Sequence, residues 1–339
     1  LEKLAKVRKW KEGDTILVRD GVYTGTGNRG LHFGGRDLAV RSMNGPIGCV
    51  IDCQLADRAF LIDQSETSAS RVEGFTIRNG SSGSGCGILV EWASPTIANC
   101  IFVDCLGVYS LGGGLALEVS GSEVKDCVFL GNRAEEGGGL YTDGGTARIH
   151  HCRFENNFAT DRGGAIEAYA GPDNRGLQLS HCEVLGNQAS NVAGGIDVIG
   201  PYGGASVPAR IENWLIAGNT APYASAIRCS YGRVDVDCST VVDNVATTSS
   251  TMYVRFSGIL RCANVIFWAN ASPDGRQATL SMPGDSLTVS YCEFQGGSAA
   301  VFLDPAATLY WGAGNLDGNP LFVDPDGPDN NPLTLDDND

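Results

Sequence analysis

The amino-acid sequence predicts an all-β fold, a right-handed parallel β-helix in which each coil of the solenoid carries three short strands. Three recurring features predict it. A polar–Cys–x–apolar motif places cysteines at Cys100, Cys127, Cys152 and Cys182, at steps of 27, 25 and 30 residues. An asparagine follows each of the later motifs, and a glycine pair then leads into an apolar stretch, as at Gly138-Gly139-Leu140. Self-similarity at such a period is typical of solenoids.

The short period explains why the coils must stack. One coil cannot close a hydrophobic core alone, so neighbouring coils pair strand to strand in parallel and bury a shared interior. Equivalent residues then lie above one another at the strand spacing of about 4.8 Å. Cysteine and apolar side chains fill the interior, and the asparagines form a hydrogen-bonded ladder at one turn. The ladder asparagines are Asn132, Asn157, Asn187, Asn219, Asn244 and Asn270.

The cysteine position continues beyond the first four motifs with other residues in it. Upstream it holds Gly74, and downstream it holds Trp214, Cys238, Val265 and Cys292. Most of the twelve cysteines therefore belong to a buried column rather than to a disulfide framework. The less regular pairs Cys49–Cys53 and Cys100–Cys105 leave a disulfide open in either place.

The ends of a solenoid expose strand edges and need covers. In residues 1–12, Leu1, Leu4, Val7 and Trp10 lie near helical spacing, which predicts an amphipathic N-terminal cap helix. The parallel β-helix then occupies residues 13–314. Residues 315–339 are rich in Asn, Asp, Pro and Gly and are expected to form a C-terminal cap or tail.

The composition excludes several kinds of partner. The 339 residues carry 24 basic and 39 acidic side chains, and the net charge of −15 repels nucleic-acid backbones. The same charge suits divalent cations. No run of 18 apolar residues is present, so the sequence predicts no membrane-spanning segment.

The stretches after the glycine pairs predict where polar side chains gather. If Ile88, Leu115, Leu140, Ile166, Ile196, Ile227 and Met252 point inward, alternation along each strand turns the next residue outward. The first outward column is then Leu89, Ala116, Tyr141, Glu167, Asp197, Arg228 and Tyr253. The second outward column, two residues further on, is Glu91, Glu118, Asp143, Tyr169, Ile199, Ser230 and Arg255.

Carboxyl groups on adjacent coils are candidates for catalysis. Glu167 beside Asp197 places two like charges about one strand spacing apart, which raises one pKa of the pair. A raised pKa suits a general acid, and its partner then serves as base or nucleophile. Glu167, Asp197 and Arg228 therefore form the candidate catalytic set. The row of Glu91, Glu118 and Asp143 repeats the pattern, and Ca²⁺ bound through carboxylate oxygens is the alternative for either cluster.

The same face offers groups that recognise sugars. Tyr141, Tyr169 and Tyr253 present flat rings, and the guanidinium of Arg255, like that of Arg228, can pair with a uronate carboxylate. Glu118 and Asp143 complete the predicted substrate-binding set. The insertions at residues 171–176 and 200–208 follow the strands that carry Glu167 and Asp197, and are expected to wall a cleft. A polar outer sheet face without a ligand is the simpler alternative.

Several segments resemble a known group of proteins. The stretches GDTILVRDGVYTG, VEGFTIRNG, SPTIANCIF and NPLFVDPDG resemble bacterial extracellular repeat proteins of the pectate-lyase-like superfamily of right-handed parallel β-helices. The segment GGAI and the Phe-x-x-Asn stretches are similar to repeats of polymorphic outer-membrane adhesins. The resemblance implies an extracellular or cell-surface location. It leaves the activity open, because this fold hosts lyases, hydrolases, epimerases and adhesins.

Two hypotheses of function follow. The first is a non-catalytic module at the cell surface or outside the cell that binds a polysaccharide or cell-surface glycan, or that self-associates into a structural assembly. The alternative is a polysaccharide lyase or glycoside hydrolase that acts on an acidic polysaccharide. The alternative expects Glu167→Gln or Asp197→Asn to abolish activity. Neither hypothesis requires a cofactor beyond the Ca²⁺ already considered.

Overall fold

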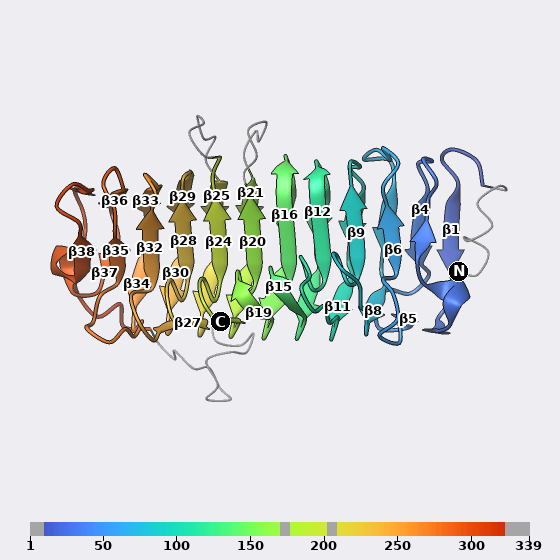
Figure 1. The fold of residues 1–339 in the computed structure, drawn as a ribbon, viewed down its shortest axis with the longest axis horizontal. Coiled ribbons are helices and arrows are strands. Elements are labelled where there is room, and N and C mark those ends of the chain that lie inside the picture. Colours follow the sequence, from blue (N-terminus) through green and yellow to red (C-terminus); the bar gives the residue numbers. More distant parts are fainter. Residues whose placement is uncertain (1–9, 170–176, 202–208, 323–339) are drawn as a thin grey trace.

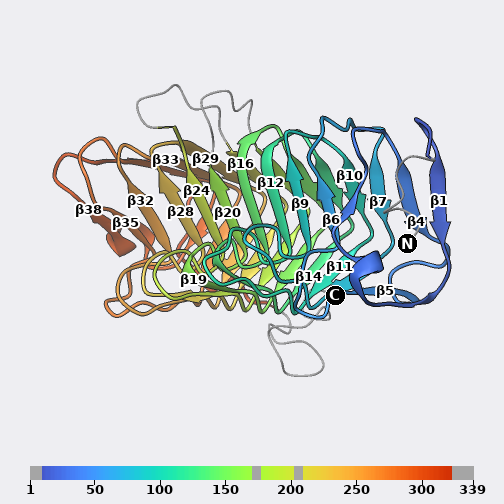
Figure 2. The ribbon, with the colours of Figure 1, turned by 45° about the vertical axis from the view of Figure 1, so that its right-hand side comes forward.

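The computed structural model describes residues 10–169, 177–201 and 209–322. Within them the chain winds into a parallel β-helix, as the sequence predicts, and each coil visits three main sheets in turn (Figure 1). One sheet holds 12 strands and the other two hold 11 each, so the chain makes about eleven turns. Figure 2 shows two of these sheets as separate walls of the solenoid.

The three main sheets are built from strands of two to six residues. Sheet A contains β1 Thr15–Val18, β4 Ala39–Ser42, β7 Arg71–Glu73, β10 Thr96–Ala98, β13 Glu123–Lys125, β17 Arg148–His150, β21 Gln178–Ser180, β25 Ala209–Glu212, β29 Arg233–Asp237, β33 Ile259–Ala263, β36 Ser286–Ser290 and β39 Thr308–Trp311. Sheet B contains β2 Gly21–Tyr23, β5 Cys49–Asp52, β8 Thr76–Arg78, β11 Ile101–Val103, β14 Val128–Leu130, β18 Arg153–Glu155, β22 Glu183–Leu185, β26 Leu215–Ala217, β30 Thr240–Val242, β34 Ile266–Trp268 and β37 Glu293–Phe294. Sheet C contains β3 Leu31–His32, β6 Phe60–Ile62, β9 Ile88–Glu91, β12 Leu115–Ser120, β16 Leu140–Gly145, β20 Ile166–Tyr169, β24 Ile196–Ile199, β28 Ile227–Ser230, β32 Met252–Arg255, β35 Ala278–Leu280 and β38 Val301–Leu303.

A fourth, shorter sheet lies between sheets B and C in the middle coils, which the prediction of three strands per coil does not include. Sheet D contains β15 Arg133–Glu136, β19 Phe158–Arg162, β23 Gln188–Ala189, β27 Thr220–Ala221 and β31 Val245–Ala246. Each of its strands follows a ladder asparagine, and Ala159, Ala189 and Ala221 form a small buried cluster along it. The repeated Asn-x-Ala spacing is the sequence signal for this sheet.

The predicted asparagine ladder is confirmed. The side-chain oxygen of Asn219 accepts hydrogen bonds from the backbone N–H and the Nδ2 of Asn187, at 2.9 and 3.0 Å. The same two bonds recur from Asn132 to Asn270 along the turn that follows sheet B. All six side chains are buried. The ladder therefore satisfies polar groups that the turn would otherwise bury without partners.

The interior is a stack of cysteine and aromatic side chains. Cys100, Cys127, Cys152 and Cys182 are buried in consecutive coils. Beside them Phe102 and Phe129 stack with ring centroids 4.7 Å apart, and the stack continues to Phe154 at 4.6 Å. A column of this kind buries apolar area in every coil, which is the main stabilising contribution to a solenoid.

The cysteine position departs from the prediction in two coils. Thr240 pairs with Leu215, so Ser239 rather than Cys238 occupies the position of Trp214. Thr76 pairs with Ile101, so Phe75 rather than Gly74 occupies the position of Cys100. In both coils the motif is shifted by one residue, and a one-residue shift moves a side chain to the other face. Cys238 is therefore exposed at the turn.

All twelve cysteines lie in the described residues, and all are free thiols. The disulfides left open for Cys49–Cys53 and Cys100–Cys105 are not formed, because a strand separates the two sulfurs in each pair. Burial raises the pKa of the thiols of Cys100, Cys127 and Cys152 far above the ordinary value. Their reactive thiolate form is therefore scarce.

Alkylation of the folded protein is expected to modify one cysteine of the twelve. Cys238 is exposed and the other eleven thiols are buried. Mass spectrometry after treatment with iodoacetamide at mildly alkaline pH checks this, with twelve adducts expected after denaturation. Several adducts on the column cysteines of the folded protein would contradict the packing of the interior.

One glycine of each pair is required by the closeness of the next coil. A Cβ on Gly138 would lie 2.3 Å from the carbonyl oxygen of Gly164, which no side chain tolerates. The pair therefore lets the turn before sheet C approach its neighbour in parallel. The preceding residue, Gly137, has a φ of 63° and reverses the chain into the strand.

The ends and the surface complete the fold. Most of the expected N-terminal cap helix and most of the expected C-terminal cap, residues 1–9 and 323–339, lie outside the described residues, and residues 10–12 are not helical. The described part has two short 3-10 turns, η2 Thr26–Asn28 and η3 Gly297–Ala300.

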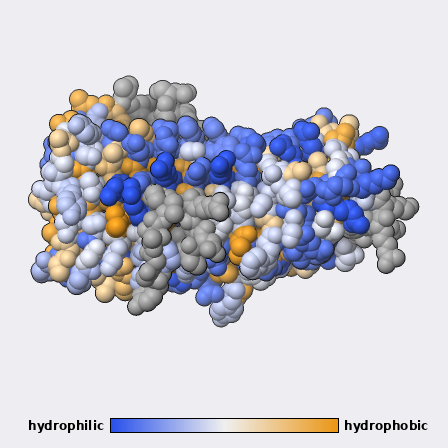
Figure 3. Space-filling model, turned by 90° about the horizontal axis from the view of Figure 1, so that it is seen from above, coloured by the Kyte–Doolittle hydropathy of each residue, from blue (hydrophilic) through white to orange (hydrophobic). Residues whose placement is uncertain are grey.

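In the described residues no helix has the length and apolar character needed to span a membrane. Seen over the turns from sheet C to sheet A, the surface is mostly hydrophilic with small apolar patches (Figure 3).

Candidate functional site

The pairing of the sheet C strands confirms the predicted register. Tyr141 pairs with Glu167, Glu167 with Asp197, and Asp197 with Arg228. Tyr253 is next in this column. In the second column Glu118 lies between Glu91 and Asp143, as expected. The predicted candidate residues are therefore neighbours in space, in the predicted order.

The first outward column is nevertheless not on the surface, which corrects the expectation of an open polar face. Glu167 and Asp197 are 0 % exposed, Tyr141 is 6 % exposed and Arg228 is 7 % exposed. The chain that returns from sheet D to sheet C folds over them. Leu111 of this segment packs on a cluster that includes Tyr141, and a Cβ on Gly163 would lie 2.8 Å from Oε2 of Glu167.

Beneath this cover lies a buried carboxyl pair with one guanidinium. Arg228 donates from Nε to Oδ1 of Asp197 at 2.6 Å, and its Nη2 lies 2.5 Å from Oδ2. The first contact is a charge-assisted hydrogen bond, and the second is an ion pair in which Oδ2 accepts no hydrogen bond from the described residues. Neither oxygen of Glu167 has a hydrogen-bond partner among the described residues. Burial and the charge of Asp197 hold the pKa of Glu167 well above its usual range.

A cleft of about 620 Å³ opens above this pair. Its lining residues come from the end of β19, from the segments that lead into sheet C and from two sheet C strands: Asp161, Arg162, Asn191, Val192, Tyr223, Arg228, Tyr253 and Arg255. Ligand sites in proteins usually have volumes of about 300 to 1,000 Å³. The lining therefore offers three guanidiniums and one carboxylate in a chain whose net charge is −15.

The three guanidiniums are not equivalent. Arg228 is committed to Asp197. Arg162 pairs with Glu136, and its Nε lies 3.2 Å from Oδ2 of Asp161. Arg255 has no ion pair within the described part of the chain, and its buried Nε has no hydrogen-bond partner there. Arg255 is therefore the guanidinium that has donors to give to a ligand.

Aromatic rings hold Arg255 in place. Its guanidinium lies 4.3 Å from the ring centroid of Phe256 and 5.8 Å from that of Tyr253. Tyr253 in turn contacts Tyr223, with ring centroids 5.9 Å apart. These contacts limit the side-chain entropy that Arg255 loses when it binds a partner.

The structure places the nine predicted site residues unevenly around the cleft. Arg228, Tyr253 and Arg255 line it. Glu167, Asp197 and Tyr141 lie beneath the surface. Tyr169 is half-buried near Arg162, at 5.9 Å from the guanidinium to the ring centroid. Glu118 and Asp143 lie along the solenoid from the cleft, toward the N-terminal coils.

Five lining residues were not predicted: Asp161, Arg162, Asn191, Val192 and Tyr223. Arg162, Val192 and Tyr223 occupy equivalent places, four residues before the first residue of the next sheet C strand, and Asp161 and Asn191 each come one residue earlier. This shared place in the repeat is the signal that would have found them. The insertions at residues 171–176 and 200–208, which were expected to wall the cleft, lie mainly outside the described residues.

The acidic row of the second column forms no metal centre. Burial, then the charges of Glu91 and Asp143, raise the pKa of Glu118, and burial raises that of Asp143. In the described residues no three histidine, cysteine, aspartate or glutamate side chains gather as metal ligands would. Like charges are paired directly along this row, Glu91 with Glu118 and Glu118 with Asp143.

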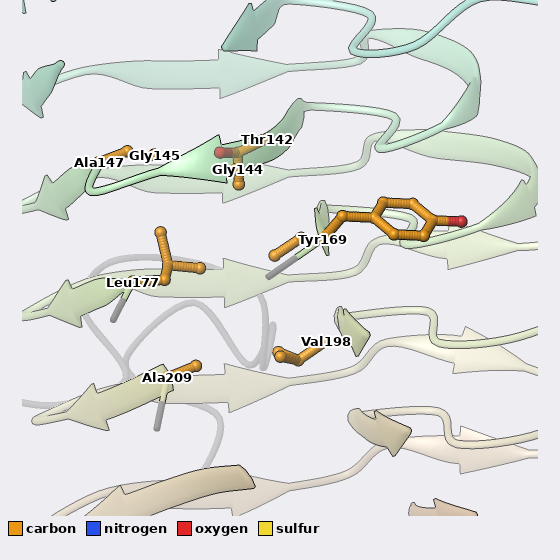
Figure 4. A pocket seen from close by; sticks show the side chains of 9 residues that line it. Thr142, Gly144, Gly145, Ala147, Tyr169, Leu177, Val198 and Ala209 are labelled. Atoms are coloured by element: carbon orange, nitrogen blue, oxygen red, sulfur yellow. The ribbon is translucent and has the colours of Figure 1, made fainter. Parts of the chain in front are cut away.

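A second, enclosed cavity lies inside the solenoid where sheet C turns toward sheet A (Figure 4). Its volume is about 10 Å³, which holds about one water molecule. Thr142, Leu177 and Val198 line it, while the ring of Tyr169 points away from it (Figure 4). The cavity is too small for a substrate, and of the two spaces only the cleft has the volume of a ligand site.

Comparison with known proteins concerns the fold. A family model described as a right handed beta helix region matches residues 19–207, more than half of the chain. A search of curated proteins and a search of solved structures each gave no match. The similarity to outer-membrane adhesins stays a prediction. The match identifies the solenoid and names no ligand or reaction.

Proposed function

The chain belongs to the family of right-handed β-helix regions, and from that premise we propose that it is a glycan-binding module whose site is the cleft above Asp197. The observation that carries the proposal is Arg255, a guanidinium without an ion pair in the described structure, held between aromatic rings at the edge of that cleft. A planar guanidinium next to aromatic faces suits a sugar that carries an acidic group.

The proposed ligand is an acidic polysaccharide or an acidic cell-surface glycan. Tyr223 and Tyr253 supply the flat faces on which sugar rings pack. Arg255 supplies parallel donors for a carboxylate or sulfate group. The cleft crosses several coils of the solenoid, so an extended chain can occupy neighbouring subsites along it.

Burial favours binding over turnover. A general acid or base must come within about 3 Å of the reacting atom. Glu167 and Asp197 are 0 % exposed and do not line the cleft. The alternative of a polysaccharide lyase or glycoside hydrolase therefore requires reacting groups other than this carboxyl pair.

We place the protein outside the cell or at the cell surface, where such glycans occur. Free thiols can persist in an oxidising environment outside the cell when they are buried, and eleven of the twelve are buried. Oxidation needs an accessible thiolate, and the column cysteines offer none.

Arg255→Ala is expected to weaken the binding of acidic glycans about tenfold to a hundredfold, because a charge-assisted hydrogen bond contributes about 1.5–3 kcal/mol. Titration calorimetry against a panel of acidic and neutral oligosaccharides measures the affinity. The matched control is Arg261→Ala, which removes the same charge from an exposed position on sheet A. If the Arg255 variant and the wild type bind with equal affinity, the cleft is not the glycan-binding site.

The same panel distinguishes binding from catalysis. Reducing ends and unsaturated products are followed after long incubation with each polysaccharide. We expect binding without products. Turnover that Glu167→Gln abolishes would establish the enzymatic alternative and its predicted site.

A further inference from the structure

Two carboxyl groups lie side by side beneath the cleft, next to one guanidinium. Glu167 of β20 and Asp197 of β24 are paired residues on adjacent strands, and both are 0 % exposed. Arg228 reaches Asp197 through two nitrogens, at 2.6 and 2.5 Å. The guanidinium of Arg228 therefore pairs with Asp197 and not with Glu167.

Glu167 has one long ion pair, with a guanidinium that it shares with other carboxylates. The Nε of Arg162 is 4.0 Å from Oε1 of Glu167, which is too long for a hydrogen bond. Arg162 is also paired with Glu136. Neither oxygen of Glu167 accepts a hydrogen bond from the described residues. An ionised carboxylate in this place would be a buried charge with no hydrogen bond and only one long ion pair, which proteins avoid.

We propose that Glu167 is a positioning residue that keeps its proton and donates a hydrogen bond to the carboxylate of Asp197. Asp197 then keeps its negative charge for Arg228, and the buried set carries no net charge. The proton also explains how two carboxyl groups lie side by side, because only a protonated one has a donor to give. The inference rests on the proposed glycan binding for its function, but its chemistry is tested independently below.

The surroundings of Glu167 support the neutral form. The titratable and charged groups that face it are Tyr141 of β16, Asp197 of β24, Arg228 of β28, Arg162 of β19 and Tyr169 of its own strand, with Glu136 of β15 behind Arg162. Burial and the charge of Asp197 outweigh the two guanidiniums, so the pKa of Glu167 lies well above its usual range.

The proton determines what the cleft can bind. With Glu167 neutral, Asp197 balances Arg228, acidic side chains flank Arg162, and the guanidinium of Arg255 faces the ligand without a partner of its own. An ionised Glu167 would add a negative charge directly under the cleft. That charge would repel an acidic sugar and compete for Arg228.

Infrared difference spectroscopy tests the proton directly. The spectrum of the wild type minus that of Glu167→Gln, at pH 7, is expected to contain the carbonyl band of a protonated carboxylic acid. The matched control is Glu212→Gln, which changes an exposed carboxyl on sheet A and is expected to remove only a carboxylate band. A carboxylate band in place of the acid band for Glu167 would overturn the inference.

Binding gives the second readout. Glu167→Gln is expected to keep the affinity for an acidic oligosaccharide within about a factor of three at pH 7, because the amide also donates to Asp197. Wild-type affinity is expected to fall at alkaline pH while that of Glu167→Gln does not. Equal pH profiles of the two proteins would contradict the inference. If no glycan binds at all, the proposed function is wrong. The infrared spectrum still shows whether Glu167 is protonated.

The stability of the protein gives a third readout, with a definite sign. A folded pKa above the unfolded value means that the folded protein holds the extra proton, so its stability falls as pH rises above about 4.3, the ordinary pKa of Glu. The melting temperature of Glu167→Gln relative to wild type is therefore expected to increase from pH 4 toward pH 8. A relative melting temperature that decreases over this range would show that the ionised form of Glu167 is the stabilising one.

Discussion

The double variant Glu167→Gln, Asp197→Asn is expected to lose about 3–5 kcal/mol of unfolding free energy, the usual cost of a buried charge whose partner is removed. Arg228 is 7 % exposed, and Asp197 is the carboxylate that pairs with it. Without either carboxyl group the guanidinium stays buried and unpaired. Urea denaturation followed by circular dichroism measures the change.

The single variants sharpen this prediction, because either carboxyl group can balance Arg228. In Asp197→Asn the neighbouring Glu167 can give up its proton and take over the charge. In Glu167→Gln the original pair is intact. Each single change should therefore cost much less than the double change, and the sum of the two should fall short of it. Additive losses would show that the two carboxyl groups act independently.

Asn187→Ala is expected to destabilise the protein by about 3–5 kcal/mol, because buried polar groups that lose their partners cost about 1–3 kcal/mol each. The Asn187 side chain donates to the carbonyl oxygen of Phe154 at 2.9 Å. Its own oxygen accepts from the backbone N–H and Nδ2 of Asn157, both at 2.9 Å. All of these groups lie in the closed turn after sheet B, where water does not replace them.

The matched control is Asn44→Ala, which removes an exposed amide bonded to Asp20. A change of less than about 0.5 kcal/mol is expected there, as for most surface substitutions. The comparison uses the same denaturation experiment. A small loss for Asn187→Ala would mean that the ladder contributes little beyond its neighbours.

The fold could be predicted from the sequence because the same sequence motif recurs in successive coils. One asparagine in one coil says little, but six at equivalent positions predict a ladder, and the structure contains it. Alternation in the stretches after the glycine pairs likewise fixed which residues pair across coils. The prediction was wrong where one coil departs from the repeat, as at Cys238. The sequence of a single coil carries no independent evidence of its register.

The cover over the first outward column could not be predicted in the same way. Alternation tells which side of a strand a residue faces, and Glu167 does face away from the interior. It does not tell whether another segment lies on that side. Here the left-handed turn residues Gly137, Gly163 and Ala193 reverse the chain directly before sheet C. The returning segment then buries the carboxyl pair and supplies much of the cleft.

This geometry changes the role of the predicted catalytic residues. The sequence placed Glu167 and Asp197 at the surface as acid and base, while the structure places them under it. Arg228 joins them to the cleft, since it contacts Asp197 and also lines the site. Arg255, predicted to pair with a uronate carboxylate, lines the cleft.

The central claim is that the cleft beside Arg255 binds an acidic glycan, and a crystal structure with a bound oligosaccharide tests it most directly. Crystals would be soaked with the acidic oligosaccharide that binds most tightly in the panel. The account predicts sugar density in the cleft against Tyr223 and Tyr253, with the acidic group of one sugar within hydrogen-bond distance of Arg255. Density for the sugar on another face of the solenoid, with the cleft empty, would contradict it.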